Sequence, residues 1–351
     1  MANLSKMMRA VQLMGHGGAE MLEIRADVLV PRAGVGEVLV RVLAAGVNNT
    51  DINTRTAWYS KSEAASGDAS WSGQALHFPR IQGADVCGEI VGVGAGVDVS
   101  RIGERILIEP CLREAGGQAL ETPWYFGSEC DGGFAEFTTV AARHAYVVNS
   151  RLTDVELASF PCSYSTAENM LTRAKVCAGE TVLVTGASGG VGSAAVQLAK
   201  VRGAIVIGVT SATKSAALSD IGVDTIVARG ENYTDRLGIN SVDVVIDLVG
   251  GKKWPELLEV LRPGGRYAVS GAIGGPLVEL DIRTLYLKDL SFFGCTVLET
   301  AVFGNLISNI ESGRVRPLVA ETFDLGEIAK AQREFEKKSH IGKIVLVVSG
   351  G

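Results

Sequence analysis

The feature that most constrains this fold is a glycine-rich turn between an apolar run and a helical pattern. Residues 181–185 (TVLVT) are followed by GASGGVG and then by an apolar face that carries Val191, Ala195 and Leu198. Glycines in this context let the backbone turn tightly and approach a pyrophosphate, while the amides of the helix N-terminus bind the anion. The segment therefore predicts a dinucleotide site in a strand–turn–helix unit. The candidate pyrophosphate contacts are Gly186, Ala187, Ser188, Gly189, Gly190, Val191 and Gly192.

The end of the next apolar run indicates which dinucleotide binds. NAD sites usually place Asp or Glu there to bind the ribose hydroxyls, but residues 205–209 are followed by no acid. Thr210, Ser211 and Lys214, together with Arg229 after the third run, favour a 2′-phosphate. NADPH is therefore the expected cofactor. The alternative is that Lys214 and Arg229 are ordinary solvated charges.

Apolar runs and helical patterns continue to alternate through this half of the chain. Runs at residues 242–246, 266–270 and 290–293 indicate a parallel, doubly wound sheet. Ala272 and Ile273, which follow the second of these runs, are further candidate cofactor residues. After Phe303 we expect a helix, a loop, a helix over 325–337 and a last strand over 343–348.

The N-terminal part has a different rhythm. Short runs at residues 37–42, 88–93 and 105–108 follow one another without helical patterns, as antiparallel strands of a barrel do. We expect a barrel domain formed by residues 1–156 and 305–351, and a cofactor domain over 157–304.

Composition excludes several classes of partner. The formal net charge is −6 and no basic block could follow a phosphate backbone, so nucleic acid is not expected. No stretch reaches the ~18 apolar residues of a membrane span, and the start lacks a signal-type run, so a cytoplasmic location is expected. The six cysteines have neither zinc-ribbon spacing nor disulfide-scaffold density, which indicates reduced thiols.

Two long segments lack periodicity. Residues 60–78 are rich in Ser, Gly and Ala, and a mobile loop is expected there. Residues 111–133 are expected to form a second long connection. Loops of this length are functional lids or simple insertions, and both alternatives remain open.

The ordered motifs resemble the medium-chain dehydrogenase/reductase superfamily. They begin at Gly46 (GVNNTD), Gly83 (GADVCGEIVGVG), Asp131 (DGGFAEF), Gly186 and His340 (HIGKIVL), and cover nearly the whole chain. The resemblance implies an α/β chain, with a GroES-like β-barrel catalytic domain and a Rossmann doubly wound parallel-sheet cofactor domain.

Zinc alcohol dehydrogenases of this superfamily place a Cys, a His-Glu pair and a second Cys or His around the catalytic metal. By that resemblance the positions here are Asn48, Ala84 with Asp85, and Cys162. Because Asn48 and Ala84 remove two ligands, too few remain for a tetrahedral site, and no metal is expected. The four close cysteines of a structural zinc site are likewise missing from residues 111–133.

Residues 48–59 resemble the N-x-x-D-x-x-x-R-x-G-x-Y pattern of the zinc-free quinone oxidoreductase, zeta-crystallin-like branch, departing at Ala57 where Gly is usual. The resemblance implies that Asn48, Asp51 and Tyr59 are catalytic residues beside the nicotinamide. Without a Lewis acid, hydride would pass to a quinone or an α,β-unsaturated carbonyl, with Asn48 and Tyr59 donating hydrogen bonds to the developing oxyanion. Protonation could come from Tyr59 or from solvent.

Each of these residues also has a purely structural interpretation. Asn48 could cap a turn, Asp51 could be a helix N-cap, and Tyr59 could belong to a loop wall. Cys162 could be a reactive thiol or, more in keeping with its type, a small buried side chain.

Two other functions remain open. One is a zinc-type alcohol dehydrogenase with atypical ligands; the other is a non-enzymatic NADPH-binding protein, since the branch includes lens crystallins. A small-molecule carbonyl or quinone is the expected substrate. The resemblance, and the apolar run over residues 290–297 as an exposed sheet edge, predict a homodimer.

Overall fold

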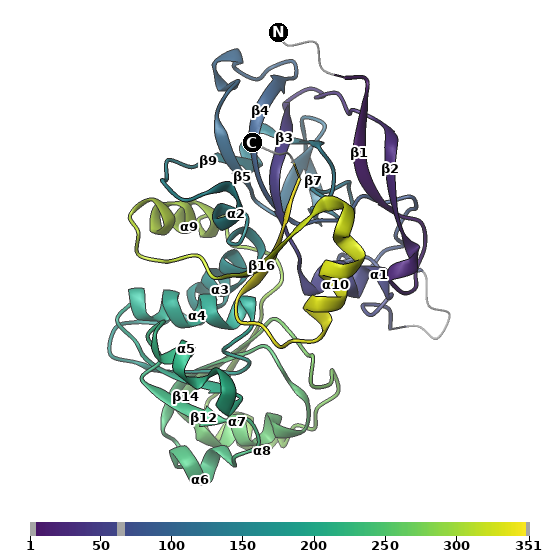
Figure 1. The fold of residues 1–351 in the computed structure, drawn as a ribbon. Helices are drawn as coiled ribbons and strands as arrows, with labels where there is room; N and C mark the ends of the chain where they lie inside the picture. The colour runs from purple at the N-terminus through teal and green to yellow at the C-terminus, as the bar shows by residue number, and fades with distance from the viewer. Residues whose placement is uncertain (1–4, 62–66, 349–351) are drawn as a thin grey trace. The chain divides into compact units, whose positions relative to one another are not determined.

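The computed structural model describes residues 5–61 and 67–348, which belong to two compact units (Figure 1). The first comprises Met1–Cys162 and Pro317–Gly351, and the second comprises Ser163–Arg316. The second unit thus includes α9 (Val302–Glu311), most of which the sequence assigned to the barrel domain. The reason lies just before α9, where the Asn169 amide donates to Val297 O and accepts from the Glu299 N–H, which holds this segment on α3 (Pro161–Arg173).

The second unit contains a six-stranded sheet whose strands are all parallel. Their order is β12-β11-β10-β13-β14-β15, and the chain reverses its winding direction between β10 and β13, as in a Rossmann fold. The doubly wound sheet is therefore confirmed. The strands are β10 (Thr181–Val184), β11 (Ile205–Thr210), β12 (Thr225–Ala228), β13 (Val242–Asp247), β14 (Leu261–Val269) and β15 (Ser291–Gly294).

The central strands of this sheet are buried on both faces, which explains their continuous apolar runs. Leu183 and Val245 of these strands join a core cluster with Trp254, Leu257 and Tyr267. The predicted edge strand is confirmed, because β15 pairs with β14 and ends the sheet. The helices of this region are α3 (Pro161–Arg173), α4 (Gly190–Val201), α5 (Ser215–Ser219), α6 (Tyr233–Leu237), α7 (Trp254–Val260), α8 (Ile282–Leu287) and α9.

The first unit is built on a seven-stranded sheet. Its path is β16-β17-β3-β4-β5-β9, and β8 also pairs with β3; every pairing is antiparallel except that of β16 with β17. The strands are β3 (Glu37–Gly46), β4 (Asp85–Val93), β5 (Arg105–Ile108), β8 (Phe137–Ala141), β9 (Ala145–Val147), β16 (Val319–Asp324) and β17 (Lys343–Val347). Two hairpins and three helices complete the unit. The hairpins are β1 (Met7–Leu13) with β2 (Leu22–Leu29) and β6 (Cys111–Ala115) with β7 (Gln118–Tyr125). The helices are α1 (Asn49–Arg55), α2 (Asp154–Leu157) and α10 (Ile328–Glu336).

Two expectations for this unit were wrong. Much of the connection over residues 111–133 is the hairpin β6–β7, whose tight turn is made by Gly116 and Gly117, both with positive φ. Residues 319–324, expected to be a loop, form β16, because pairing with β17 satisfies a backbone whose side chains are mostly exposed and polar. Of the expected mobile loop, residues 62–66 lie outside the described residues, and the remainder consists of turns and bends.

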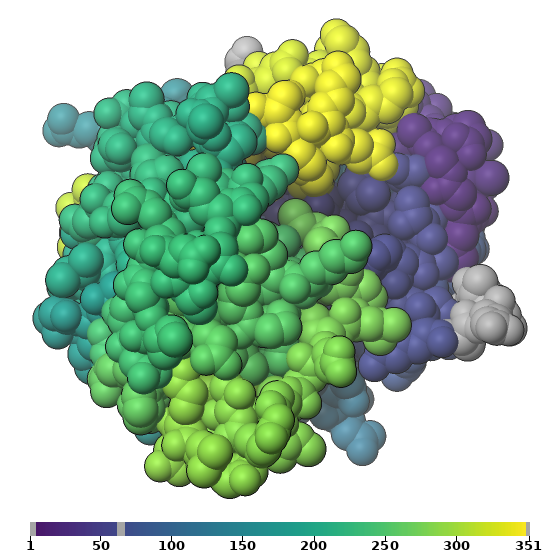
Figure 2. Space-filling model, turned by 90° about the horizontal axis from the view of Figure 1, so that it is seen from below, coloured from purple at the N-terminus to yellow at the C-terminus, as the bar shows by residue number. Residues whose placement is uncertain are grey.

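The chain returns to its first unit at the end. Figure 2 shows the yellow C-terminal segment against the purple and blue N-terminal segments of the same unit. Arg55, 2% exposed, anchors this contact by donating to Gly17 O (2.8 Å), Gln332 Oε1 (3.0 Å) and Glu336 Oε1 (3.2 Å). Among the described residues, no helix has the length and apolar character needed to cross a membrane.

Ala57, directly after α1, has a φ of 58°, in the left-handed region that favours glycine. A side chain with a Cβ is strained there by ~1–2 kcal/mol, and glycine recovers part of this after its larger entropy loss on folding. We therefore expect Ala57→Gly to raise the free energy of unfolding by about 0.5–1 kcal/mol, measured by urea denaturation. Ala216→Gly, at an exposed position of helix α5, is the matched control and should lower it by a similar amount. A loss of stability in Ala57→Gly would contradict the strain.

Candidate active site

The start of α1 brings Asn48 and Asp51 together. Asn48 is the N-cap of the helix and Asp51 is its third residue. The Asn48 N–H donates to Asp51 Oδ2 (2.7 Å), and the Gly83 N–H donates to Asp51 Oδ1 (3.2 Å). Asn48 is therefore the residue that occupies the N-cap position. Asp51 is not the N-cap, and its carboxylate accepts a hydrogen bond from the N–H of Asn48. Both side chains are buried, at 5% and 2% exposure.

Around Asn48 lies a buried cluster that the motif pattern did not reveal. Asp85, fully buried at the start of β4, accepts from Asn48 Nδ2 (2.9 Å) and from the Cys162 N–H (2.5 Å). Lys343 at the start of β17 places its Nζ 2.7 Å from Asp85 Oδ2 and 2.5 Å from Asn48 Oδ1. A Cβ at Gly46 would lie 2.5 Å from Asp85 Oδ2, so this approach requires glycine.

Aromatic side chains adjoin the cluster. The Tyr125 hydroxyl hydrogen-bonds the Cys162 sulfur (2.9 Å), and Trp71 stacks on the Tyr125 ring at 4.9 Å. Together with Ala84 these residues form a small apolar group. Burial raises the pKa of the Cys162 thiol to about 12. The thiol is therefore protonated at neutral pH, which favours the buried over the reactive interpretation of Cys162.

Tyr59 lies near the same groups. Burial raises the pKa of its phenol, hydrogen bonds with Thr50 and Asn53 lower it, and the nearby Cys162 and Asp51 raise it further. The hydroxyl is consequently protonated at neutral pH and can donate. The structure thus brings Asn48, Asp51 and Tyr59 into one region of the first unit.

In the second unit, the predicted pyrophosphate turn joins β10 to α4. Gly186 has a φ of 59°, Gly189 is the N-cap, and α4 begins at Gly190. A Cβ at Gly192 would lie 2.2 Å from Gly186 O, so only glycine lets the helix start so close to the turn. The Ala187 N–H donates to Val209 O (3.1 Å). Ser188 and Val191 lie within the same turn and first helical residues.

The candidate phosphate residues also lie together, at the carboxyl ends of β11 and β12. The Arg229 N–H donates to Thr210 O (2.7 Å), and Ser211 Oγ lies 3.1 Å from Thr213 Oγ1. The Thr210 hydroxyl is buried and makes no hydrogen bond to a described residue. Partial burial and the neighbouring charge of Arg229 lower the pKa of Lys214. Two cations therefore share this corner of the sheet.

Asp247, at the end of β13, is a residue that sequence reasoning missed. It accepts from the Thr185 hydroxyl (2.5 Å) and the Tyr267 hydroxyl (2.6 Å), and from the N–H groups of Val249 and Gly250. It thereby holds the loop after β13 beside the turn after β10. An acid closing an apolar run was its only signal in the sequence.

The loop after β14 carries Ala272 and Ile273. The Gly274 N–H donates to Val249 O (2.7 Å), and a Cβ at Gly251 would lie 2.3 Å from Gly274 O. The loops after β13 and β14 are therefore in close contact, on the same side of the sheet as the β10 turn. Ile273 is 66% exposed.

Comparison with known proteins identifies the family. The chain matches the alcohol dehydrogenase GroES-like domain over residues 34–150 and the zinc-binding dehydrogenase domain over residues 190–312. It is 30% identical to quinone oxidoreductase of Rattus norvegicus, over 99% of this chain and 100% of that protein. It is 31% identical to acryloyl-coenzyme A reductase of Metallosphaera sedula, over 97% of this chain and 99% of that protein.

The chain belongs to the medium-chain dehydrogenase/reductase superfamily, in its quinone oxidoreductase-like branch. A solved structure from Sinorhizobium meliloti 1021 is 45% identical, covers 99% of both chains and has a TM-score of 0.92. A cobalt- and zinc-bound alcohol dehydrogenase from Pyrobaculum aerophilum is 30% identical, with 97% of this chain and 99% of that chain covered and a TM-score of 0.83. Oxidoreductases of this superfamily bind a nicotinamide cofactor. The GroES-like and Rossmann architecture is confirmed.

A catalytic zinc does not fit the donor set of this medium-chain reductase. Of the positions that hold the metal in zinc enzymes, Asn48 offers an amide, Ala84 offers nothing, and Asp85 is bonded to the Lys343 ammonium. A divalent cation would be repelled by an ammonium that lies against Asn48 and Asp85. Within residues 5–61 and 67–348, no group of three or more His, Cys, Asp and Glu side chains is arranged to hold a metal.

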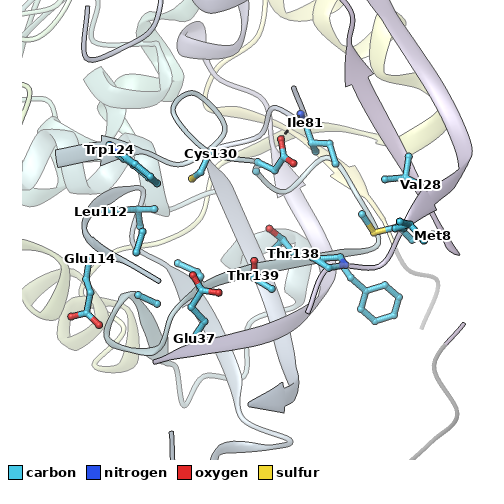
Figure 3. Close-up of a pocket in the computed structure, with 18 residues that line it drawn as sticks. Met8, Val28, Glu37, Ile81, Leu112, Glu114, Trp124, Cys130, Thr138 and Thr139 are labelled. Atoms are coloured by element: carbon cyan, nitrogen blue, oxygen red, sulfur yellow. Dashed lines mark hydrogen bonds between the residues drawn. The ribbon is translucent and has the colours of Figure 1, made fainter. Parts of the chain in front are cut away.

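The first unit also contains a cavity of about 260 Å³ (Figure 3). Its walls include residues of β1, β2, β6, β7 and β8, among them Met8, Leu112, Trp124 and Thr138. None of Asn48, Asp51 or Tyr59 lines it, so this cavity is separate from the candidate active site.

Burial raises the pKa of Asp51 to about 7, although hydrogen bonds from the Asn48 and Gly83 N–H groups and the charge of Lys343 oppose the shift. Because the folded pKa lies above the unfolded value, folding takes up a proton between about pH 4 and pH 7. Stability is therefore lost as the pH rises through this range, by on the order of 4 kcal/mol. We expect Asp51→Asn to be much less pH-dependent in its free energy of unfolding.

The measurement is urea denaturation of both proteins at several pH values. The change in the free energy of unfolding with pH is compared, not its absolute value, because asparagine has one acceptor oxygen where aspartate has two and the substitution itself alters stability. Asp235→Asn, at an exposed position of α6, is the control and should follow the wild type. Parallel curves for wild type and Asp51→Asn would contradict the raised pKa.

Proposed function

We propose that this protein is an NADPH-dependent reductase that delivers hydride to a quinone or an α,β-unsaturated carbonyl without a catalytic zinc. The observation that carries the proposal is the buried Asn48–Asp85–Lys343 cluster, in which Lys343 bonds two residues that, by the resemblance, stand at metal-ligand positions of zinc enzymes. An alcohol needs a Lewis acid or a strong base to release hydride, whereas a quinone or enone is already electron-poor. The names of the quinone oxidoreductase and acryloyl-coenzyme A reductase relatives support this choice of acceptor.

The chain's residues divide the work between binding and chemistry. Bound NADPH would supply the hydride. The turn Gly186–Gly192 and the N-terminus of α4 would bind its pyrophosphate, and Thr210, Ser211, Lys214 and Arg229 its 2′-phosphate. Ala272 and Ile273 would contact it from the neighbouring loop. This assignment rests on Rossmann geometry and on the two cations at the ends of β11 and β12.

On the first unit, the resemblance assigns Asn48, Asp51 and Tyr59 to the reacting end of the cofactor. The Tyr59 phenol, protonated at neutral pH, would donate to the developing oxyanion and could pass it a proton. Asn48 has one long hydrogen bond, from Nδ2 to Gly46 O (3.3 Å), which it could exchange for a bond to the acceptor oxygen. Asp51 would hold the N-terminal turn of α1, and with it Asn48, in place.

Two further functions compete with this one. A relative from Sulfolobus acidocaldarius, 29% identical, is named an NAD-dependent alcohol dehydrogenase, so a zinc-type enzyme with atypical ligands is the second candidate. Metal analysis tests it, because about one zinc per chain would overturn the zinc-free proposal. A non-enzymatic NADPH-binding protein would bind the cofactor yet oxidise none of it with any acceptor.

We also propose that two copies pair through the edge strand β15. Phe292 of this strand and Ile282, Tyr286 and Leu287 of α8, the helix that precedes it in the chain, are exposed apolar side chains. An unpaired apolar edge promotes uncontrolled association, and pairing with a second copy would cover it.

We expect NADPH to bind at least tenfold more tightly than NADH, a difference of ~1.4 kcal/mol that one charged contact to phosphate can supply. Lys214→Ala should reduce this ratio, as measured by fluorescence titration with both cofactors. Arg236→Ala, an exposed arginine on α6, is the control and should leave the ratio unchanged. Equal affinities in the wild type, or an unchanged ratio in Lys214→Ala, would refute the 2′-phosphate site.

We expect chelators to leave turnover unchanged, and Tyr59→Phe and Asn48→Ala to slow hydride transfer by up to about 100-fold with little effect on NADPH affinity. Losing an oxyanion donor costs ~10² to 10³ in rate, but a quinone is intrinsically reactive, so the smaller effect is expected. Stopped-flow NADPH oxidation with quinones, enals and enoyl thioesters is the assay. Tyr146→Phe makes the same change at a partly exposed position of β9 and serves as the control. Wild-type rates in both site variants, or inactivation by chelators, would count against the mechanism.

A further inference from the structure

Lys343 is a buried lysine held by oxygens from distant parts of the chain. Its side chain is 4% exposed, and its Nζ lies between Asp85 Oδ2 (2.7 Å) and Asn48 Oδ1 (2.5 Å). Burying an ammonium is costly unless it is paired and hydrogen-bonded, and a well-packed apolar residue is often as stable at such a position. A lysine here therefore points to a requirement beyond packing.

The ammonium determines how the Asn48 amide is turned. An ammonium can only donate hydrogen bonds, so the oxygen of the amide must face Lys343. The carboxylate of Asp85 can only accept, so Nδ2 must face Asp85, as observed at 2.9 Å. The two charges thus select one of two otherwise similar amide orientations. That orientation places the second Nδ2 hydrogen on the weak bond to Gly46 O.

The ammonium also balances charge around the site. Two carboxylates, Asp85 and Asp51, are buried beside it. The other titratable groups that interact with this cluster are those of Tyr59, Tyr125 and Cys162, in each of which burial raises the pKa, and that of Lys338, in which burial lowers the pKa to about 8. The two phenols and the thiol are neutral at pH 7, whereas Lys338, whose Nζ donates to Asn49 Oδ1 (2.8 Å), is a cation. Without Lys343, the buried Asp85 would therefore keep its charge with no ammonium bonded to it.

We propose that Lys343 is a positioning residue of this reductase, which turns the Asn48 amide nitrogen toward Asp85 and cancels the Asp85 charge beside the reacting acceptor. Its effect on rate rests on the function proposed above. Negative charge that develops on the acceptor during hydride transfer would otherwise approach buried carboxylates, which opposes the reaction. The ammonium acts through Asn48 and Asp85 and takes no part in the transfer of hydride or proton.

The test compares Lys343→Met, Lys343→Arg and the double variant Asp85→Asn/Lys343→Met, with Lys330→Met on the exposed face of α10 as the control. Single-turnover NADPH oxidation should slow by about 10- to 100-fold in Lys343→Met with an NADPH Kd within about twofold of wild type. Lys343→Arg should recover most of the rate. The double variant should remain slow, because neither charge then orients the Asn48 amide, which keeps only the long bond to Gly46 O.

A second readout, thermal unfolding against pH, does not depend on turnover. In Lys343→Met the unpaired Asp85 would bind a proton on folding, so its Tm should fall relative to wild type as the pH rises from about 5 to 8. The double variant lacks the Asp85 carboxylate, so its Tm should not show this additional decrease with rising pH. Lys330→Met should match the wild type in rate and in pH trend.

The outcomes separate the inference from the proposed function. If the wild-type protein fails to oxidise NADPH with any tested quinone or enone, the proposed function fails. The pH trends of the Tm still test the charge balance. A wild-type rate in Lys343→Met, or a pH trend of its Tm identical to that of wild type, would overturn the role of Lys343. Should Lys343→Met fail to fold, the double variant decides the question. If the double variant folds and oxidises NADPH at the wild-type rate, the positioning of Asn48 is overturned.

Discussion

The buried ion pair between Lys343 and Asp85 is the constraint on which the candidate active site depends. It joins the last strand of the chain to β4, and through Asn48 it reaches the start of α1. These residues lie up to 295 positions apart, so the cluster forms only when the C-terminal segment has returned to the first unit. The site is therefore completed by the final strand.

Glycine makes close approach possible in both units. At Gly46 the absence of a side chain leaves room for the Asp85 carboxylate, and at Gly192 it leaves room for the carbonyl of Gly186. Gly46 thus lets the Asp85 carboxylate lie against the backbone that leads to Asn48, and Gly192 lets the start of α4 lie against the pyrophosphate turn. A Cβ at either position would displace charged or hydrogen-bonding atoms, whose energies depend steeply on distance.

The second unit obtains its site in a different way, from the topology of its sheet. Parallel strands end at the same edge, so the turns after β10, β11, β13 and β14 gather without long-range side-chain contacts. Asp247 then ties two of these loops together by accepting from four donors. The cofactor site depends mainly on backbone geometry, whereas the site of the first unit depends on buried charge.

The sequence by itself determined the antiparallel barrel strands and the parallel sheet, because these follow from local periodicity and from glycine placement. The late position of the apolar run over residues 290–297 indicated the edge strand. The sequence also indicated the Gly186–Gly192 turn, whose function resides in its own backbone. It did not determine β16, whose polar strand forms only by pairing with β17, or the β6–β7 hairpin, which was expected to be an irregular connection. The partners of Asn48 were likewise decided by the tertiary structure, since a buried lysine and aspartate attract each other through space and leave no periodic signal in the sequence.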